Sequence, residues 1–158
     1  QAKAASRAET YLNGLNVEEE IRKMYISEKV SEVSAITQVR KRLVAQQQQL
    51  GKKKGVVMDG RDIGTKVFPN AELKIFMQAD LYVRAERMQK DYLARNQKED
   101  FDQIVQNIKN RDLQDTTRTD SPLVKADDAY LLDVTSITVE EQVGFVMKLV
   151  EKTIGSKQ

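Results

Sequence analysis

The chain has neither cysteine nor histidine among its 158 residues. Without cysteine there is no disulfide framework and no thiolate nucleophile. Without histidine as well, the sequence excludes Cys/His zinc sites, Ser–His and Cys–His nucleophilic pairs, and a histidine general base. These two absences remove most metal-centred and nucleophilic mechanisms.

Long apolar runs and strong net charge are also missing. No apolar run approaches the roughly 18 residues that a membrane span needs, and the start of the chain shows no signal-peptide pattern. The formal net charge is only +2, which is too small to indicate nucleic-acid binding without a clustered basic face. We therefore expect a cytoplasmic globular protein with no membrane or nucleic-acid partner.

Hydrophobic periodicity predicts alternating strands and helices. Short apolar runs bounded by glycine or acidic residues are typical of buried parallel strands. They occur at 55–59, 73–77 and 129–133. Apolar residues with helical spacing lie at 30–43, 81–92, 101–118 and 139–150. This order predicts an α/β fold with a parallel sheet covered by helices.

Polar residues mark several predicted helix boundaries. Asn16 precedes two glutamates and suits the N-cap of a short helix, and Asp80 suits the cap of the helix that follows it. Thr138 and Glu141 have the spacing of a capping box. Thr37 is expected to interrupt the helical stretch at 30–43.

The first chemically informative segment follows the predicted strand at 55–59. It reads Asp59-Gly60-Arg61-Asp62-Ile63-Gly64-Thr65. In open α/β sheets, ligands bind beyond the carboxyl ends of the strands. An arginine at that place can hold a phosphate through two parallel hydrogen bonds. The alternative is a surface turn with a local Arg–Asp pair, and spacing alone supports both interpretations equally.

The second segment lies at the end of the predicted helix at 101–118. Arg111, Asp115 and Arg118 are separated by four and three residues, so they share one helix face. They could clamp a phosphorylated sugar. Spacing alone nevertheless favours an exposed ladder of ion pairs. Ser31 and Arg40, taken alone, are typical of surface residues.

The sequence contains no P-loop. That motif requires Gly-x-x-x-x-Gly-Lys-Ser/Thr before a helix. The segment Gly51-Lys52-Lys53-Lys54-Gly55 has neither the spacing nor the hydroxyl residue, and it precedes a predicted strand.

Three separated segments together resemble bacterial cytidylate kinases. Residues 55–76 resemble the strand and loop signature of that family, and 108–123 resemble its lid and the segment after it. Residues 11–22 resemble its inserted nucleotide-binding subdomain. The resemblance extends in the correct order from about Tyr11 to Ile154.

The resemblance implies a P-loop nucleoside monophosphate kinase fold that lacks its first strand, P-loop and helix. Residues 1–50 would be the remainder of the inserted subdomain. Residues 51–158 would form the core α/β domain, with the lid at about 90–120. Because the missing strand is central in the family's sheet, its loss should leave a gap and expose apolar surface.

The resemblance also implies residue roles. Ser31, Arg40 and Asp62 would read the cytosine edge. Arg61 and Arg118 would bind the α-phosphate, while Arg111 and Asp115 would hold the sugar. Arg61, Arg111 and Arg118 would be the catalytic residues, and no metal ligand is implied within the chain.

The implied reaction is transfer of the ATP γ-phosphoryl group to CMP or dCMP, giving CDP or dCDP, with Mg²⁺, in an enzyme expected to be monomeric. Because the P-loop is missing, these residues are expected to be inactive alone. The alternatives are a non-catalytic nucleotide-binding fragment and a kinase for another monophosphate such as UMP or AMP. Competition among the monophosphates distinguishes these substrates.

Overall fold

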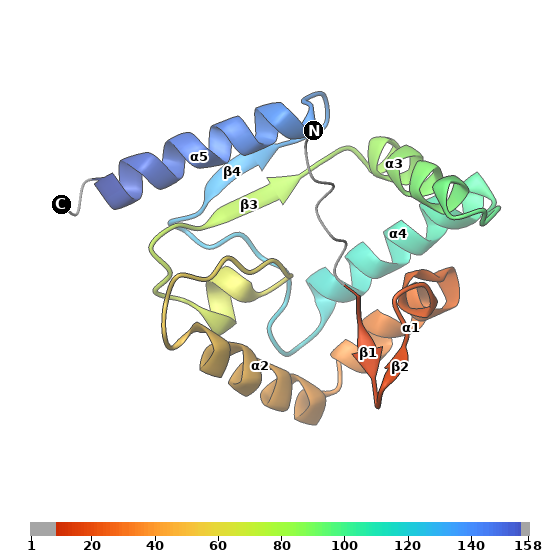
Figure 1. Cartoon of the computed structure of the whole chain (residues 1–158), viewed down its shortest axis with the longest axis horizontal. Helices are drawn as coiled ribbons and strands as arrows, with labels where there is room; N and C mark the ends of the chain where they lie inside the picture. Colours follow the sequence, from red (N-terminus) through yellow and green to blue (C-terminus); the bar gives the residue numbers. More distant parts are fainter. Residues whose placement is uncertain (1–8, 156–158) are drawn as a thin grey trace.

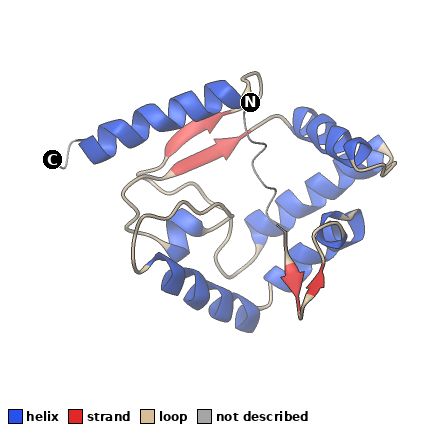
Figure 2. Ribbon diagram, viewed as in Figure 1, coloured by secondary structure: helices blue, strands red, loops and turns tan. Residues whose placement is uncertain are grey.

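The computed structural model describes residues 9–155, although the side chains of Ser31 and Ile154 lie outside the description. It is a mixed α/β structure that is mostly helical (Figure 2). Among residues 9–155, none of the helices combines the length and the hydrophobicity that a membrane span requires. In chain order, the elements are β1 (Tyr11–Leu12), β2 (Leu15–Asn16), the 3₁₀ helix η1 (Glu20–Arg22), α1 (Met24–Ser34), α2 (Thr37–Gly51), the π-helix η2 (Ile63–Val67), β3 (Ile75–Gln78), α3 (Leu81–Ala94), α4 (Phe101–Thr117), β4 (Tyr130–Asp133) and α5 (Val139–Gly155).

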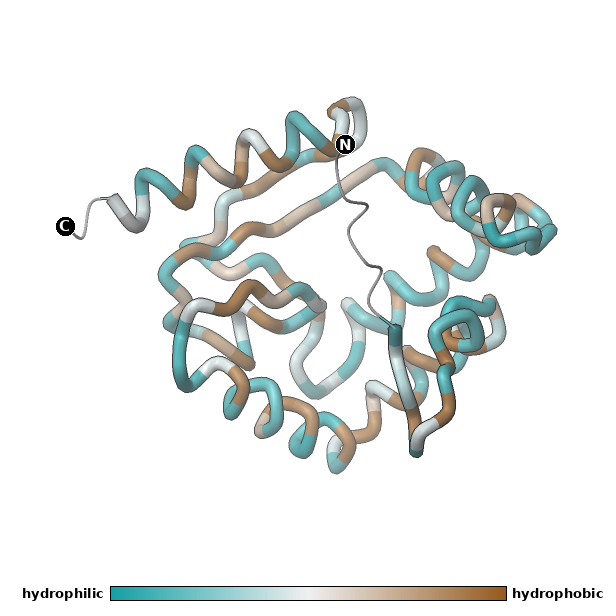
Figure 3. The backbone as a smooth tube through the Cα atoms, in the orientation of Figure 1, coloured by the Kyte–Doolittle hydropathy of each residue, from teal (hydrophilic) through white to brown (hydrophobic). Residues whose placement is uncertain are grey.

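Strands β3 and β4 form a parallel pair, with Ile75 opposite Tyr130 and Gln78 opposite Asp133. The central residues of both strands are hydrophobic (Figure 3), and Figure 1 shows α5 following β4 in the chain. The predictions of strands at 73–77 and 129–133, and of their parallel direction, are confirmed.

The predicted strand at 55–59 is wrong. No regular element covers these residues, and the side chain of Val57 is fully exposed. A strand needs a neighbour to satisfy its N–H and C=O groups. In the described part of the chain, β3 pairs with β4 and no strand lies beside 55–59. The parallel sheet there has two strands rather than three.

The core lies mainly between α3 and α4. Ala85 and Tyr92 of α3 are buried against Ile104, Val105 and Ile108 of α4. These residues belong to the apolar faces that the sequence predicts for the two helices. The side chain of Asp80 accepts hydrogen bonds from the backbone N–H groups of Tyr82 and Val83, so the predicted cap of α3 is confirmed.

The capping box before α5 is also confirmed. The Glu141 carboxylate accepts from the Thr138 backbone N–H at 2.7 Å, and the Thr138 hydroxyl accepts from the Glu141 N–H at 3.2 Å. The apolar face of this helix is only partly covered, because Val139 and Val143 remain more than half exposed.

The N-terminal elements differ in part from the prediction. The expected interruption is confirmed, since α1 ends at Ser34 and α2 begins at Thr37. Asn16, however, caps no helix: it lies in β2, and its side chain accepts from the Glu18 N–H at 3.0 Å. Asn13 and Gly14, both with positive φ, form the turn of the β1–β2 hairpin, as this type of tight turn requires.

Candidate functional site

One carboxylate joins the two segments that the sequence predicts to carry chemistry. Asp115, near the end of α4, is buried and accepts from Arg61 Nε through Oδ2 at 2.9 Å. Its Oδ1 accepts from Arg118 Nη1 at 3.2 Å. Two guanidinium groups from distant parts of the chain therefore lie on either side of one carboxylate.

A second ion pair adds α2 to this site. Arg40 of α2 donates from Nη2 to Asp62 Oδ2, and both side chains are buried. The other oxygen of Asp62 lies 4.0 Å from Arg118 Nη2. Because this pair, Asp115 and Arg118 are buried, neither a surface turn nor an exposed ion-pair ladder describes the site.

The site carries more positive charge than its own acids neutralise. Arg40, Arg61 and Arg118 contact two aspartates, Asp62 and Asp115, which leaves an excess of one positive charge, and the charge of Arg111 lies near Arg61. Burial lowers the pKa of Arg118, and the nearby charge of Arg40 lowers it further. Burial also lowers the pKa of Arg111, helped by the charge of Arg61.

Several of these guanidinium groups also have buried N–H groups without an acceptor among the described residues. These are Nε of Arg40, Nε of Arg111 and Nη2 of Arg118. A buried donor without an acceptor is costly. The combination of excess positive charge and unsatisfied donors is complementary to an anion.

Arg111 stands somewhat apart from the other arginines. Its Nη1 donates to the hydroxyl of Ser27 in α1 at 2.8 Å, and that hydroxyl lies 3.3 Å from Asn107 Oδ1. Ser31 lies in α1, but its side chain is outside the described residues.

The sequence predictions missed two of these residues. Asn107 precedes Arg111 by four residues and so shares its helix face, which is a usable signal. Ser27 has no such signal, because its partners lie about 80 positions away in the chain.

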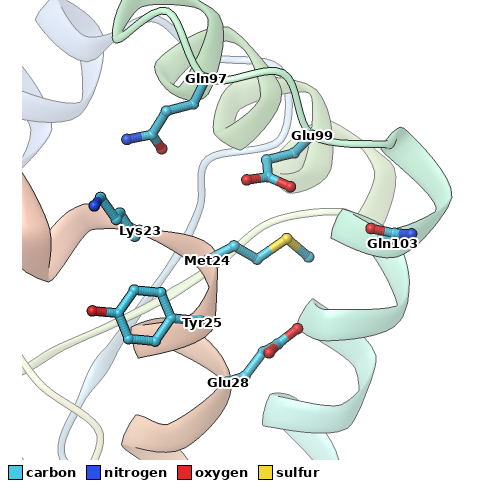
Figure 4. A pocket seen from close by; sticks show the side chains of 7 residues that line it. All are labelled: Lys23, Met24, Tyr25, Glu28, Gln97, Glu99 and Gln103. Atoms are coloured by element: carbon cyan, nitrogen blue, oxygen red, sulfur yellow. The ribbon is translucent and has the colours of Figure 1, made fainter.

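Two pockets lie near the site, and neither is lined by Arg40, Arg61 or Arg118. One, of about 390 Å³, is lined by residues that begin α1 and by others from the α3–α4 connection and α4 (Figure 4). None of the predicted site residues lines it. The other, of about 330 Å³, lies between α1 and α3 and is bordered by Ser27 and Arg111.

Among residues 9–155, no cluster of acidic side chains is arranged as a ready-made metal site. Mg²⁺ takes oxygen ligands, most often from carboxylates and phosphates. Within residues 9–155, no group of three or more acidic side chains is placed to hold a metal ion. Asp62 and Asp115 are already paired with arginines.

Comparison with known sequences agrees with the resemblance. The profile of the family described as cytidylate kinase matches residues 1–152. The chain is 67% identical over 141 residues to a cytidylate kinase of Cytophaga hutchinsonii, an alignment that covers 89% of this chain and 60% of that relative. A cytidylate kinase of Bacteroides fragilis is 53% identical over 94% of this chain and 65% of its own length. One from Parabacteroides distasonis is 50% identical over 95% of the chain and 66% of its own length. The chain thus spans between 60% and 66% of the length of these relatives.

Proposed function

Because this chain belongs to the cytidylate kinase family, we propose that it provides the nucleoside monophosphate site of an enzyme that transfers the ATP γ-phosphoryl group to CMP or dCMP. The observation that carries the proposal is the cluster of Arg40, Arg61 and Arg118 around Asp62 and Asp115, which has more positive than negative charge and of which Arg61 alone is half exposed. A phosphate monoester carries about −1.5 to −2 charges at pH 7 and three acceptor oxygens. It therefore matches both the charge and the unsatisfied donors.

Arg61 and Arg118 are the proposed ligands of the α-phosphate. Asp115 holds the two guanidinium groups side by side, with contacts of 2.9 and 3.2 Å. The Arg61 side chain is about half exposed (47%), so a ligand can reach it, while the buried Arg118 Nη2 has an N–H to donate. Two arginines fixed in this way can each donate to phosphate oxygens in parallel.

Asp62, Arg40 and Ser31 are the proposed base-reading residues. Asp62 bonds Arg40 through Oδ2, and its Oδ1 is 4.0 Å from Arg118, beyond hydrogen-bond length. Oδ1 can therefore accept from the exocyclic amino group of cytosine. A carboxylate favours that donor over the carbonyl oxygen of uracil at the same position.

Asp115 and Arg111 are the proposed sugar contacts. Each carboxylate oxygen of Asp115 can accept more than one hydrogen bond, so pairing with arginines leaves room for a sugar hydroxyl. Arg111 lies one helical turn before Asp115 on the same face of α4.

The proposed fold is that of the P-loop nucleoside monophosphate kinases, with the inserted subdomain at 1–50, the core at 51–158 and the lid at about 90–120. Phosphoryl transfer depends mainly on positioning and charge neutralisation. The arginines Arg61, Arg111 and Arg118 would supply both at the acceptor end. Since the 158 residues contain no P-loop motif, we expect them to bind CMP without transferring phosphate when expressed alone.

Calorimetric titration of the 158-residue chain with CMP, UMP and AMP tests this function. We expect CMP to bind most tightly, and Arg61→Ala to weaken CMP binding by at least about 10-fold because the phosphate loses a charged donor. Arg42→Ala is the matched control, since Arg42 is an exposed arginine on α2 close to Arg40.

The outcomes separate the parts of the proposal. UMP or AMP binding as tightly as CMP would contradict the base-reading assignments. Equal effects of the Arg61 and Arg42 variants would contradict the phosphate site. Phosphotransfer from ATP by the purified 158 residues would contradict the expectation that they bind without catalysis.

A further inference from the structure

We propose that Ser27, oriented by Asn107, is a positioning residue that holds the Arg111 guanidinium in place for the sugar of the bound nucleotide. This proposal rests on the proposed function, because it concerns the same monophosphate site. It adds two residues that neither the sequence motifs nor the resemblance assigned.

The chemistry of the three side chains determines which of them donates and which accepts in the two hydrogen bonds that join Arg111, Ser27 and Asn107. An arginine is only a donor, so the 2.8 Å contact from Arg111 Nη1 requires Ser27 Oγ to act as acceptor. The Ser27 proton is then directed to Asn107 Oδ1 at 3.3 Å. Asn107 is buried on α4, one helical turn before Arg111, so its side chain has little freedom to move. The serine lone pair is consequently held facing the arginine.

The contact matters because the surroundings of Arg111 leave its guanidinium group room to move. The cavity of about 330 Å³ lies against its side chain, so neighbouring atoms do not pack it fully on that side. Arg61 repels it electrostatically while Asp115 and Asp112 attract it, and its Nε has no acceptor among the described residues. Among the described residues, Ser27 accepts the hydrogen bond that this guanidinium group donates. Without it, the side chain could turn into the cavity and away from the arginine cluster.

The contact also links two elements. Ser27 is on α1, whereas Arg111 is on α4, and these helices contact each other (Figure 1). A ligand that engages Arg111 is therefore coupled to the position of α1.

The test compares Ser27→Thr with Ser27→Val in the 158-residue chain. These two variants have nearly the same shape, but only threonine retains the hydroxyl acceptor. We expect Ser27→Val to weaken CMP binding by about 10-fold, because a hydrogen bond to a charged group is lost. Ser27→Thr should stay within about threefold of the unsubstituted protein. Thr153→Val is the control, since the Thr153 hydroxyl donates to Leu149 O within α5.

Inorganic phosphate serves as the second probe. Because Arg111 is assigned to the sugar, phosphate affinity should change by less than about twofold in Ser27→Val. A general loss of structure would weaken both ligands together and would overturn the positioning role. The ¹⁵N-detected signal of Arg111 Nε–H should shift on CMP addition in the Ser27→Thr protein and lose that shift in Ser27→Val.

Failure of this inference differs from failure of the proposed function. If the unsubstituted chain binds CMP and the threonine and valine variants bind it equally, Ser27 does not position Arg111, while the CMP site stands. If the unsubstituted chain binds no CMP, both proposals fail.

Discussion

At the scale of single residues, Asp115 is the group that allows the arginine cluster to form. Arg61 and Arg118 both contact its carboxylate, and this charge offsets their mutual repulsion. Removing one member of a buried ion pair costs about 3–5 kcal/mol, because the remaining charge is left uncompensated. Asp62 has the same relation to Arg40. The two aspartates thus stabilise the cluster, and the excess positive charge is left for a ligand.

Asp62→Asn is expected to relax the preference for cytosine. The asparagine keeps a carbonyl oxygen that can accept from Arg40, and it adds an amide N–H₂ that can donate to the carbonyl oxygen of uracil. The ratio of CMP to UMP affinity should fall by about 10-fold or more, while phosphate affinity changes little. Competition binding measures the ratio, with Asp127→Asn in an exposed loop as control. An unchanged ratio would remove Asp62 from base reading.

At the scale of elements, α4 brings the core and the site onto one helix. Its first half buries Ile104, Val105 and Ile108 against α3, and its second half carries Arg111 and Asp115. The packed half fixes the helix axis. The fixed helix axis places the half of α4 that carries Arg111 and Asp115 against the segment that contains Arg61 and Asp62.

The packed half and the charged half of α4 are separated along the helix. A substitution at the start of α4 should therefore lower the stability of the fold without changing CMP affinity. The Asp100 side chain caps this helix by accepting from the Gln103 N–H at 3.0 Å. Asp100→Ala should lower the free energy of unfolding by about 1 kcal/mol, the usual value for losing an N-cap. CMP affinity should remain within about twofold. Urea denaturation and calorimetry measure the two quantities, and a matching loss of affinity would show that the cap also shapes the site.

The sequence predicted elements well where the local pattern was sufficient. Asp80 and the Thr138–Glu141 box are short-range signals, and both form as predicted. The prediction of a strand at 55–59 was wrong, because strand pairing depends on a neighbour that is distant in the chain. The hairpin at Asn13–Gly14 was missed although Asn-Gly is a strong turn signal, because each of its strands has only two residues.

The predictions for the site divide in the same way, between signals that are local in the sequence and contacts between distant residues. Spacing placed Arg111, Asp115 and Arg118 on one face of a helix, but it favoured an exposed ladder. Burial of Asp115 depends on the approach of Arg61 from 54 residues away, which no helical pattern contains. The resemblance grouped Arg61 with Arg118 and Arg40 with Asp62, and these side chains lie together in the structure. A resemblance of several segments carries information about distant contacts that periodicity lacks, and the roles that it implies stay predictions.

At the scale of the whole molecule, the parallel strand pair and the helix that follows it keep much of their apolar surface exposed. Met77 in β3 and Leu131 in β4 are about half exposed, as are Val143 and Met147 of α5. Val57, in the unpaired segment, is fully exposed. That a missing neighbouring strand causes this exposure stays a prediction, because exposed apolar side chains such as Leu15 and Leu113 also lie outside the strand pair. The exposure of each valine predicts how much its substitution should change the free energy of unfolding.

A matched pair of valines tests this description. Val57 buries no side-chain surface, whereas Val67 in η2 is 2% exposed. Val57→Ser should change the free energy of unfolding by less than about 0.5 kcal/mol, while Val67→Ala should lower it by about 2 kcal/mol through lost burial and a new cavity. Urea denaturation of both variants measures these values, and equal m values would show that the unfolded states are comparable.

A cost above about 1 kcal/mol for Val57→Ser would mean that apolar atoms cover this side chain in solution. The segment at 55–59 would then be packed, and its description as an unpaired stretch beside a two-stranded parallel sheet would be wrong.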